Sequence, residues 1–474
     1  MPPRHRRRQY FLGPLLALLL TGMAGPAPAE QTNLPDLSGD LYVLGERYND
    51  YAESLIQNLR RYGRLVHDPV VSDFMNRLSD RIASAAEPPL ALRLFVINDD
   101  SINAFAMPPN FVGVNTGLIL NARTEDELAA VIAHEVSHLT LRHVDRAMQE
   151  ADKLGPATTG AILAALILGA YDPTLAEAAI ATTIAANIQS QLSFSRGSEK
   201  EADRAGIQVL VRAGYDPEAM AAFFQRLLDN ESLNAKAPVF VRTHPLTSDR
   251  VAEARSRAKK LRAQYDPALD PADPIAFALL KVRIAQQTGI PPAKVIDQDS
   301  PAPVRRYVQI LERMDKGETQ AALRELQALM DSDRPRIPYL LTLSELYKRA
   351  GDYEAAIDLL RRYIGYFPGN IPLIVYYADM LIEERKSDEA VAVLERHIKY
   401  GLRNPALFLS LSRAYANQNR QGHAHIMLSN YYFMLGEYKL SLKELTLSLS
   451  YEDLDPKEKR LVQRKIRIIT DNLD

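Results

Sequence analysis

The segment His134–His138, which reads His-Glu-Val-Ser-His, decides how the N-terminal half of this chain is interpreted. Residues four apart lie on one face of a helix, so the two imidazoles can reach a single zinc ion, and Glu135 can take a proton from water bound to that ion. The same pattern also occurs by chance in ordinary helices. The motif predicts a zinc site with His134 and His138 as ligands and Glu135 as general base, provided that another part of the sequence supplies the third ligand.

The sequence before this motif specifies where its helix begins. Thr124 is a favourable N-cap residue, and Glu127 three positions later completes a capping box. At 100° per residue, one side of the helix is apolar and the two histidines lie well away from that side. The apolar stripe consists of Leu128, Ile132, Val136 and Leu139. We therefore expect the stripe to anchor in the core while the histidines face a cleft.

A catalytic zinc ion also needs a third protein ligand and one open position for water. Glu199 and Asp203 are four residues apart in a second predicted helix, so they share a face. This spacing lets Glu199 bind the metal while Asp203 accepts a hydrogen bond from a ligating histidine. Glu201 is offset by about 200° and is expected to point elsewhere. The alternative is that these acids are ordinary solvated charges on an exposed helix.

The sequence before the motif helix predicts a small sheet. Apolar residues recur every fourth position within residues 36–86, which is typical of helices. Three strands are expected next, in Leu92–Asn98, Asn103–Ala106 and Phe111–Val114, with a turn at residues 108–110. The peptidase part is therefore expected to combine helices with a few short strands.

The C-terminal part of the chain contains an internal repeat. The seven residues that begin at Gly317 recur from Gly351, 34 positions later, and Ala356 recurs at the same spacing as Ala390. A 34-residue period with glycine in the turn and small residues in the second helix is the signature of tetratricopeptide repeats, and generic helical hairpins are the alternative. The predicted fold class is mainly α: a zincin-type α+β metallopeptidase domain with a small β-sheet, followed by an α-helical tetratricopeptide solenoid.

Two features of the sequence predict the domain boundaries. One is the N-terminal segment, and the other is a segment rich in Pro, Asp and Gln at about 289–304. Four arginines precede an apolar run from Phe11 to Leu20, and the order is typical of a secretory signal peptide cleaved after Ala29. A membrane anchor is the alternative, although the run is shorter than the roughly 20 residues that a bilayer core requires. We expect a signal peptide at 1–29, a zinc metallopeptidase domain at 30–288, a linker at 289–304 and a tetratricopeptide-repeat domain at 305–474.

Composition and charge exclude several functions. The chain has 57 basic and 59 acidic residues and a formal net charge of -2, so no positive surplus favours nucleic acid. It has no cysteine, which excludes cysteine proteases, disulfides and cysteine-ligated zinc. The Ala-, Thr- and Leu-rich stretch between Leu154 and Leu192, whose apolar run is 155–171, is too short to predict a membrane span and is expected to form a buried or mutually packed helical hairpin. A mobile cover over the cleft or peripheral membrane contact are the alternatives for this stretch.

Four motifs in this order resemble the HtpX/CaaX-protease family of zinc peptidases. With the signal peptide and the repeats, the chain from Asp36 onward is similar to periplasmic members of this family that assist β-barrel assembly. The resemblance implies an endopeptidase in which His134, His138 and Glu199 hold one zinc ion, Glu135 is the general base and Asp203 supports a ligand. The motifs are Asn103–Ala106, His134–His138, Ser195-Arg196 with Glu199 and Asp203, and Thr243-His244-Pro245 through Arg250. One departure is that Pro108-Pro109-Asn110 stands where the family has Pro-Gly-Gly.

The resemblance also implies a role for His244 and a set of partners. This histidine is expected to be either a fourth ligand that reversibly blocks the zinc ion or a catalytic helper that stabilises the oxyanion or orients the substrate. The implied partners are unfolded or stalled outer-membrane proteins, and the β-barrel assembly machinery through the repeats. His143 does not fit the third ligand of a metzincin, because its spacing from His138 is wrong. The competing hypothesis is a non-proteolytic periplasmic chaperone or scaffold with latent or structural zinc.

Overall fold

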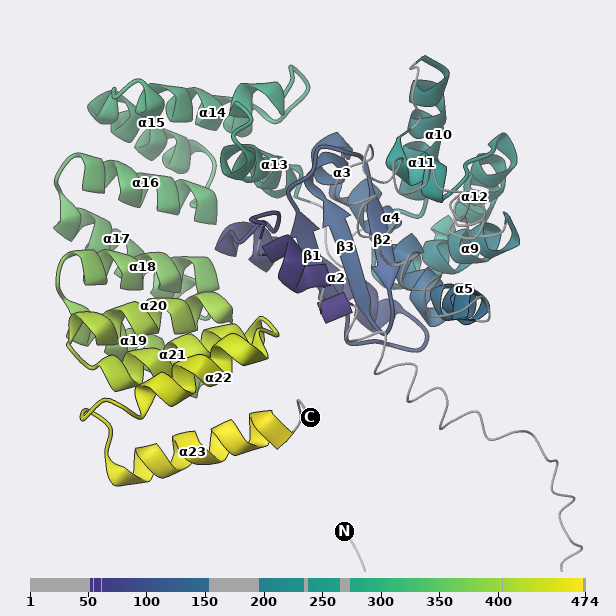
Figure 1. Ribbon diagram of the computed structural model, residues 1–474. Helices are drawn as coiled ribbons and strands as arrows, with labels where there is room; N and C mark the ends of the chain where they lie inside the picture. Colours follow the sequence, from purple (N-terminus) through teal and green to yellow (C-terminus); the bar gives the residue numbers. More distant parts are fainter. Residues whose placement is uncertain are drawn as a thin grey trace, which may run out of the picture. The chain divides into compact units, whose positions relative to one another are not determined.

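The computed structural model describes residues 52–53, 55–60, 62–152, 196–233, 238–264, 273–402 and 404–471. These residues form a mostly helical protein with one small sheet, as Figure 1 shows. The mainly α fold class is thereby confirmed. Within the described ranges, no helix combines the length and the apolar character that crossing a membrane requires. The predicted signal peptide and the stretch 155–171 lie outside the described residues.

The peptidase part consists of helices arranged around the sheet (Figure 1). Its helices are α2 (Pro69–Ala85), α3 (Thr116–Asn121), α4 (Glu125–Thr140), α5 (His143–Asp152), α9 (Arg196–Arg212), α10 (Glu218–Leu233), α11 (Val239–Thr243), α12 (Ser248–Leu261), the 3-10 turn η1 (Arg262–Gln264) and α13 (Pro274–Thr288). The motif segment lies in α4, and the segment with the two spaced acids lies in α9.

The sheet has three strands in the order β1-β3-β2. The strands are β1 (Arg93–Ile97), β2 (Ala104–Met107) and β3 (Phe111–Asn115), which confirms the three predicted strands to within one residue at each end. β3 pairs in parallel with β1 and antiparallel with β2. The strand β2, which precedes the motif helix in the sequence, is therefore at an edge of this sheet.

The helix α4 begins where the sequence predicts, but its capping differs in one bond. Thr124 accepts a hydrogen bond from the backbone N–H of Glu127 at 3.2 Å, as expected. The Glu127 carboxylate accepts from the backbone N–H of Arg123 at 2.7 Å, whereas a capping box would have used Thr124. Arg226 donates to both Glu127 oxygens, at 2.6 and 2.7 Å, and so fixes the position of this carboxylate.

The helix α4 is buried on every side, which corrects one expectation. Leu128, Ile132 and Val136 are 0% exposed, and so are His134 and His138. The histidines therefore do not line an open cleft. The physical reason is that α9 and α10 pack on the sides of α4 that the sheet does not cover.

The repeat part consists of successive helix pairs, which Figure 1 shows in green to yellow. Its helices follow the 3-10 turn η2 (Pro292–Lys294) and are α14 (Ala302–Asp315), α15 (Thr319–Ser332), α16 (Ile337–Arg349), α17 (Tyr353–Tyr366), α18 (Ile371–Glu383), α19 (Ser387–Lys399), α20 (Pro405–Asn417), α21 (Gln421–Met434), α22 (Tyr438–Ser448) and α23 (Pro456–Asp471). Consecutive helices pack against each other, as stacked repeats require.

The 34-residue period is visible in the backbone of the repeats. Gly317, Gly351, Arg385 and Asn419 are spaced by this period, and all four have φ between 58° and 78°. Glycine adopts this left-handed conformation freely, while other residues do so at a cost. The alanines that the period relates are Ala322, Ala356, Ala390 and Ala424, and each of them is buried. Small residues at these sites let the helices of each pair approach closely.

Helix α13 connects the two parts. Its residues Leu279 and Val282 belong to the same apolar core as Tyr307 of α14. Arg283 of α13 donates to Asp68 at 2.7 Å and to the Tyr376 hydroxyl at 2.7 Å, so one guanidinium joins the start of α2 to α18. The linker at 289–304 stays a prediction, since these contacts do not define a boundary.

Candidate metal centre

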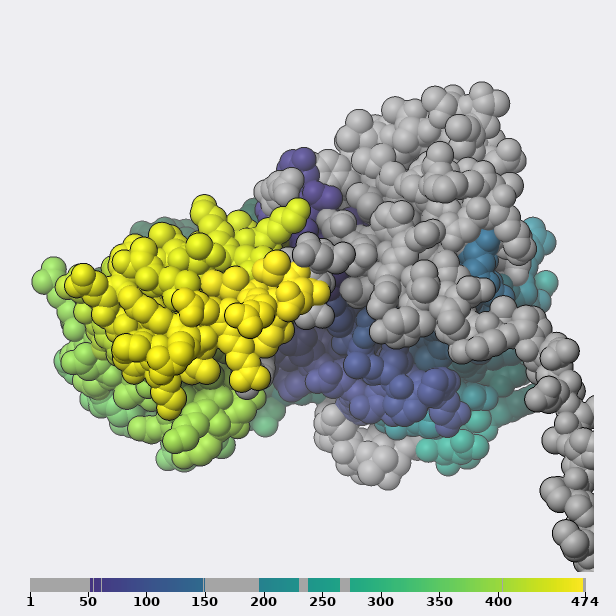
Figure 2. Space-filling view, turned by 60° about the horizontal axis from the view of Figure 1, so that its bottom comes forward, coloured from purple at the N-terminus to yellow at the C-terminus, as the bar shows by residue number. Residues whose placement is uncertain are grey.

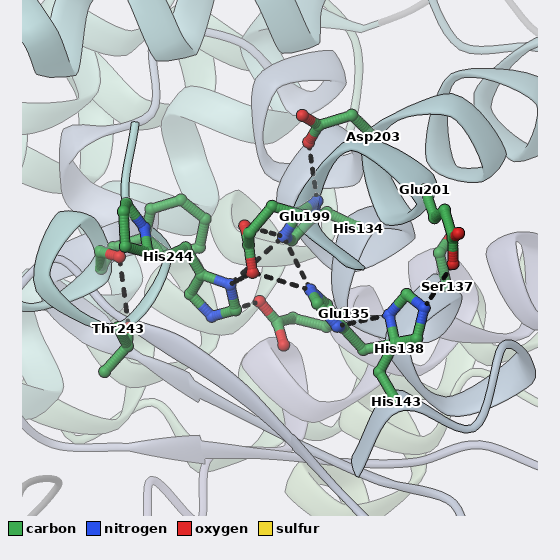
Figure 3. A network of polar contacts seen from close by, with 12 residues as sticks. His134, Glu135, Ser137, His138, His143, Glu199, Glu201, Asp203, Thr243 and His244 are labelled. Atoms are coloured by element: carbon green, nitrogen blue, oxygen red, sulfur yellow. Dashed lines mark hydrogen bonds and ion pairs between the residues drawn. The ribbon is translucent and has the colours of Figure 1, made fainter. Parts of the chain in front are cut away.

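Four side chains from different parts of the peptidase sequence meet in the interior. His134 and His138 come from α4, Glu199 from the first turn of α9, and His244 from the residue after α11. Each offers one donor atom, and these atoms lie within 4.8 Å of one another. Figure 3 shows the four side chains pointing toward a common centre. Their relative exposure is 2% or less, so a ligand held between them is shielded from bulk water.

A glycine allows α9 to approach α4 closely enough for this arrangement. A Cβ atom on Gly206 would lie 3.3 Å from the backbone nitrogen of His134 and 2.9 Å from Cε of Met220. Such distances are shorter than ordinary van der Waals contacts, so a side chain at this position would press the two helices apart. The absence of a side chain therefore helps to place the start of α9, with Glu199, next to the histidines of α4.

The spacing of the donor atoms fits a small tetrahedral cation. His134 Nε2 lies 3.1 Å from His138 Nε2 and 3.5 Å from Glu199 Oε2, and His138 Nε2 lies 3.4 Å from Glu199 Oε1. Ligands about 2.0–2.1 Å from a tetrahedral zinc ion are separated from one another by about 3.3 Å. Nitrogen and oxygen donors in this arrangement are a normal zinc-binding set, so the residues present fit the metal.

His244 adds a fourth donor to this set. Its Nδ1 atom lies 3.3 Å from His134 Nε2 and 3.1 Å from Glu199 Oε1. Its other ring nitrogen lies 3.4 Å from Glu135 Oε1. The His244 ring is stacked on Phe240 of α11, with ring centroids 4.7 Å apart, which holds the imidazole in place. His244 is thus in reach both of the donor cluster and of Glu135.

A second layer of charges surrounds the cluster. Asp203 Oδ1 lies 3.0 Å from His134 Nδ1, one turn of α9 beyond Glu199. Arg250 of α12 donates to both Asp203 oxygens, at 2.7 and 2.8 Å, and its Nη1 atom lies 2.7 Å from Glu199 Oε2. Arg250 is only 2% exposed. The sequence had marked Arg250 as part of a motif without assigning it a role, and the structure places it between the two acids.

The electrostatics of the cluster favour a bound cation. Burial alone lowers the pKa of His134, but hydrogen bonds to the Asp203 and Glu199 carboxylates outweigh it and raise that pKa to about 10. Burial opposes the ionisation of Glu199, yet the charge of His244 and hydrogen bonds from His134 and His138 hold its pKa well below the usual value. Buried, ionised carboxylates that stabilise a positive charge on His134 this strongly also favour a divalent cation.

Figure 3 shows Glu135 beside the cluster. This residue is itself fully buried. Burial raises the pKa of its carboxyl group, against the opposing charges of His244 and His134. A raised pKa brings a carboxylate closer to the range in which it can both accept and return a proton near neutral pH. This position and environment suit a general base.

His143 and Glu201 form a contact that sequence reasoning missed. His143 Nδ1 lies 3.1 Å from His138 Nδ1, and His143 Nε2 lies 3.1 Å from Glu201 Oε2. His143 is 2% exposed and begins α5, directly after Arg142, which has a left-handed φ of 58°. Glu201 points away from Glu199, as predicted, but it reaches His138 through His143. The sequence signal is a histidine five residues after the motif, which indicates a structural or cleft-rim histidine but identifies no partner.

Comparison with known proteins agrees with this geometry. Residues 69–258 match the model of peptidase family M48, and residues 347–411 match a tetratricopeptide repeat model. The β-barrel assembly-enhancing protease of Yersinia pestis is 32% identical over 429 residues, which cover 88% of this chain and 82% of the relative. The protein of the same name from Escherichia coli K12 is 29% identical over 435 residues, with 90% and 82% covered.

A third relative, from Vibrio cholerae, is described as a putative β-barrel assembly-enhancing protease. It is 33% identical over 399 residues, which cover 81% of each chain. The match includes both the peptidase part and the repeats, at the same order along the chain. This chain therefore belongs to the β-barrel assembly-enhancing proteases, a group of M48 metallopeptidases that carry tetratricopeptide repeats.

Proposed function

We propose that this chain is a zinc-dependent endopeptidase in which His134, His138 and Glu199 hold the metal. The observation that carries the proposal is the spacing of their donor atoms, 3.1–3.5 Å, which matches the ligand separation around a tetrahedral zinc ion. Two helices supply the three ligands, as in catalytic zinc sites that leave one position open for water.

When bound, zinc supplies Lewis-acid polarisation of the scissile carbonyl and of a water molecule. Glu135 accepts the proton of the attacking water and returns it to the leaving amine. Asp203 accepts a hydrogen bond from His134 Nδ1–H, which keeps Nε2 of that ring directed into the centre. Arg250 offsets the negative charge of Asp203 and Glu199, so that both acids stay ionised in the interior.

The edge strand β2 is the proposed docking site for the substrate. An extended peptide can add to a free sheet edge through main-chain hydrogen bonds, with little dependence on its side chains. Residues 104–107 form the edge strand of the described sheet, are buried, and pack on α4, which carries Glu135. The turn after β2 contains Pro108, Pro109 and Asn110, so it is stiffer than a Pro-Gly-Gly turn and presents the substrate differently.

His244 is proposed to keep the enzyme latent. Its Nδ1 atom lies among the donor atoms of the three ligands, where it can serve as a fourth ligand in the position that water needs. Displacing this imidazole would open the site. The alternative role is that His244, once displaced, stabilises the oxyanion or orients the substrate.

The repeats are proposed to select the substrates. Stacked helix pairs form extended surfaces for protein partners, and tethering them to the peptidase raises the local concentration of a captured protein. The relatives are named β-barrel assembly-enhancing proteases, which supports a role in β-barrel assembly. The proposed clients are unfolded or stalled outer-membrane proteins, and the proposed partner is the β-barrel assembly machinery. The N-terminal sequence supports export to the periplasm with cleavage after Ala29.

A second candidate function is a periplasmic chaperone or scaffold whose zinc is latent. The position of His244 inside the cluster favours it, because a permanently bound fourth ligand would exclude water. The buried Glu135 argues for an enzyme, since a structural metal site has no need of a further buried acid beside the ligands.

Metal analysis combined with a Glu135→Gln substitution separates the two functions. We expect the wild-type chain to bind one zinc ion and to cleave casein or itself. Glu135→Gln should bind zinc equally well and lose at least about a hundredfold in cleavage rate, because proton transfer is lost. Glu312→Gln, an exposed substitution in α14, is the matched control and should cleave normally. Equal cleavage by Glu135→Gln and wild type would reject the peptidase mechanism.

A further inference from the structure

The last helix, α23, combines apolar and basic side chains on its exposed face. Leu461 is 57% exposed and Ile468 is 52% exposed. These two residues are seven positions apart, so they lie on nearly the same side of the helix. Four exposed basic residues lie near this pair: Lys457 and Arg464 within about 60° of it around the helix, and Arg460 and Arg467 about 100° away. The chain as a whole has a net charge of -2, so this positive face is a local feature.

An adjacent face of α23, about 100° around the helix from Leu461 and Ile468, accounts for its packing. Val462 and Ile469 are about 5% exposed or less and form an apolar cluster with Leu445 of α22. Lys465 also turns inward, where it contacts Asn430 of α21. Leu461 and Ile468 are not members of this cluster. Both side chains are more than half exposed, so a large part of their aliphatic surface faces solvent.

The neighbouring helix α22 repeats the arrangement. Leu440 and Leu447 are also seven positions apart, and each is 39% exposed. The exposed residues Lys439 and Lys443 lie next to them on the helix. Figure 2 shows the C-terminal helices, in yellow, at the surface of the molecule. Exposed leucines flanked by lysines or arginines thus occur on both of the last two helices.

We propose that this outer face of α23 binds the surface of an anionic phospholipid bilayer. Helices that lie in a membrane interface place aliphatic side chains among the acyl chains and lysines or arginines against the anionic headgroups. The exposed pair Leu461 and Ile468 and the four basic residues match this chemistry. The inference concerns lipid binding by the repeat part and is independent of the peptidase reaction.

The shape of the face favours a lipid surface over a peptide. Peptides bind in grooves or along strand edges, where two or more elements surround them. Two cavities of about 680 and 300 Å³, by contrast, are lined by residues of other helices and loops. An outward helix face can instead lie flat on a bilayer, and its arginine stems can extend along the apolar boundary.

Vesicle sedimentation with the full chain tests the proposal. We expect binding to vesicles of equal parts phosphatidylethanolamine and phosphatidylglycerol, weaker binding in high salt, and little binding to phosphatidylcholine vesicles. Each basic residue near an anionic surface contributes about fivefold in affinity, so Arg460→Gln/Arg464→Gln/Arg467→Gln should reduce binding at least about tenfold. Leu461→Gln/Ile468→Gln should also reduce it, because the apolar contribution is removed.

A matched variant controls for net charge. Lys316→Gln/Arg396→Gln/Lys399→Gln removes three exposed basic residues, one after the end of α14 and two in α19, and should bind vesicles like the wild type. Thermal melts monitored by circular dichroism verify that all variants are folded. The proposal is overturned if the wild type does not bind the anionic vesicles, or if the control loses as much affinity as the α23 variant. Two results together would also overturn it: Leu461→Gln/Ile468→Gln binds the anionic vesicles as well as the wild type does, and polyglutamate displaces the protein from them. The face would then recognise an acidic polymer and not a lipid surface.

Discussion

Asp203 Oδ1 lies 3.0 Å from His134 Nδ1, so this carboxylate contacts the imidazole on the nitrogen that does not face Glu199. A carboxylate in this position fixes the tautomer of the ring and strengthens its other nitrogen as a ligand. Arg250 holds the same carboxylate with two hydrogen bonds. The orientation of His134 therefore depends on residues of α9 and α12 as well as on its own helix.

Asp203→Asn should weaken zinc binding by about 10–100-fold, because the amide carries no charge with which to support the His134 ring. The fold should stay intact. Competition with a chromogenic chelator measures the affinity. Asp249→Asn, an exposed substitution one residue before Arg250, is the control and should bind zinc like the wild type. Unchanged affinity in Asp203→Asn would show that this acid is not a support for the ligand.

Gly206→Ala should destabilise the chain by about 1–3 kcal/mol and weaken zinc binding, because the added methyl group presses on Met220 and on the backbone of His134. Gly365→Ala is the matched control in α17, where an added Cβ meets no atom within 4 Å. That control should be neutral or slightly stabilising. Urea unfolding and the zinc affinity of both variants provide the measurements. If the two variants behave alike, the close approach at Gly206 does not position α9.

His143→Ala should lower zinc affinity about tenfold, since His138 loses the partner that orients its ring. Glu201→Gln should have a smaller effect in the same direction, because its side chain is 59% exposed and acts through His143. The d–d spectrum of the cobalt-substituted chain reports the coordination geometry directly. A spectrum identical to that of the wild type in His143→Ala would limit this residue to a packing role.

The sequence predicted those parts of the centre that depend on spacing within one helix. The pairs His134 and His138, and Glu199 and Asp203, are each four residues apart, and helical geometry alone puts each pair on one face. The strands and the start of α4 were predictable for a similar reason: strand patterns and helix capping both depend on residues that are close together in the sequence. The period of 34 residues likewise predicted the repeats.

Contacts between helices could not be predicted in this way. Arg250 reaches Asp203, and Glu201 reaches His143, only because α12 and α5 pack on α9 and α4 at particular angles. The burial of His134 and His138 depends on the same packing, which hydrophobic spacing does not specify. In the repeats, Arg385 and Asn419 adopt the left-handed turn conformation that glycine has at Gly317 and Gly351. A search for glycine alone misses these two turns.

His244→Ala should raise the rate of casein or self-cleavage if this histidine blocks the open position, because the fourth donor is removed. His423→Ala removes a histidine of the repeats far from α4 in sequence and serves as the control. A higher rate with unchanged zinc content supports the latent state. A clean loss of activity would instead assign His244 to catalysis.

X-ray absorption at the zinc edge of the zinc-loaded full chain tests the metal centre most directly. The account predicts one bound zinc ion with imidazole nitrogens and a carboxylate oxygen at about 2.0–2.2 Å, and a changed spectrum with weaker binding in Glu199→Ala. A chain that stays metal-free after zinc loading, or an identical spectrum in Glu199→Ala, would contradict it.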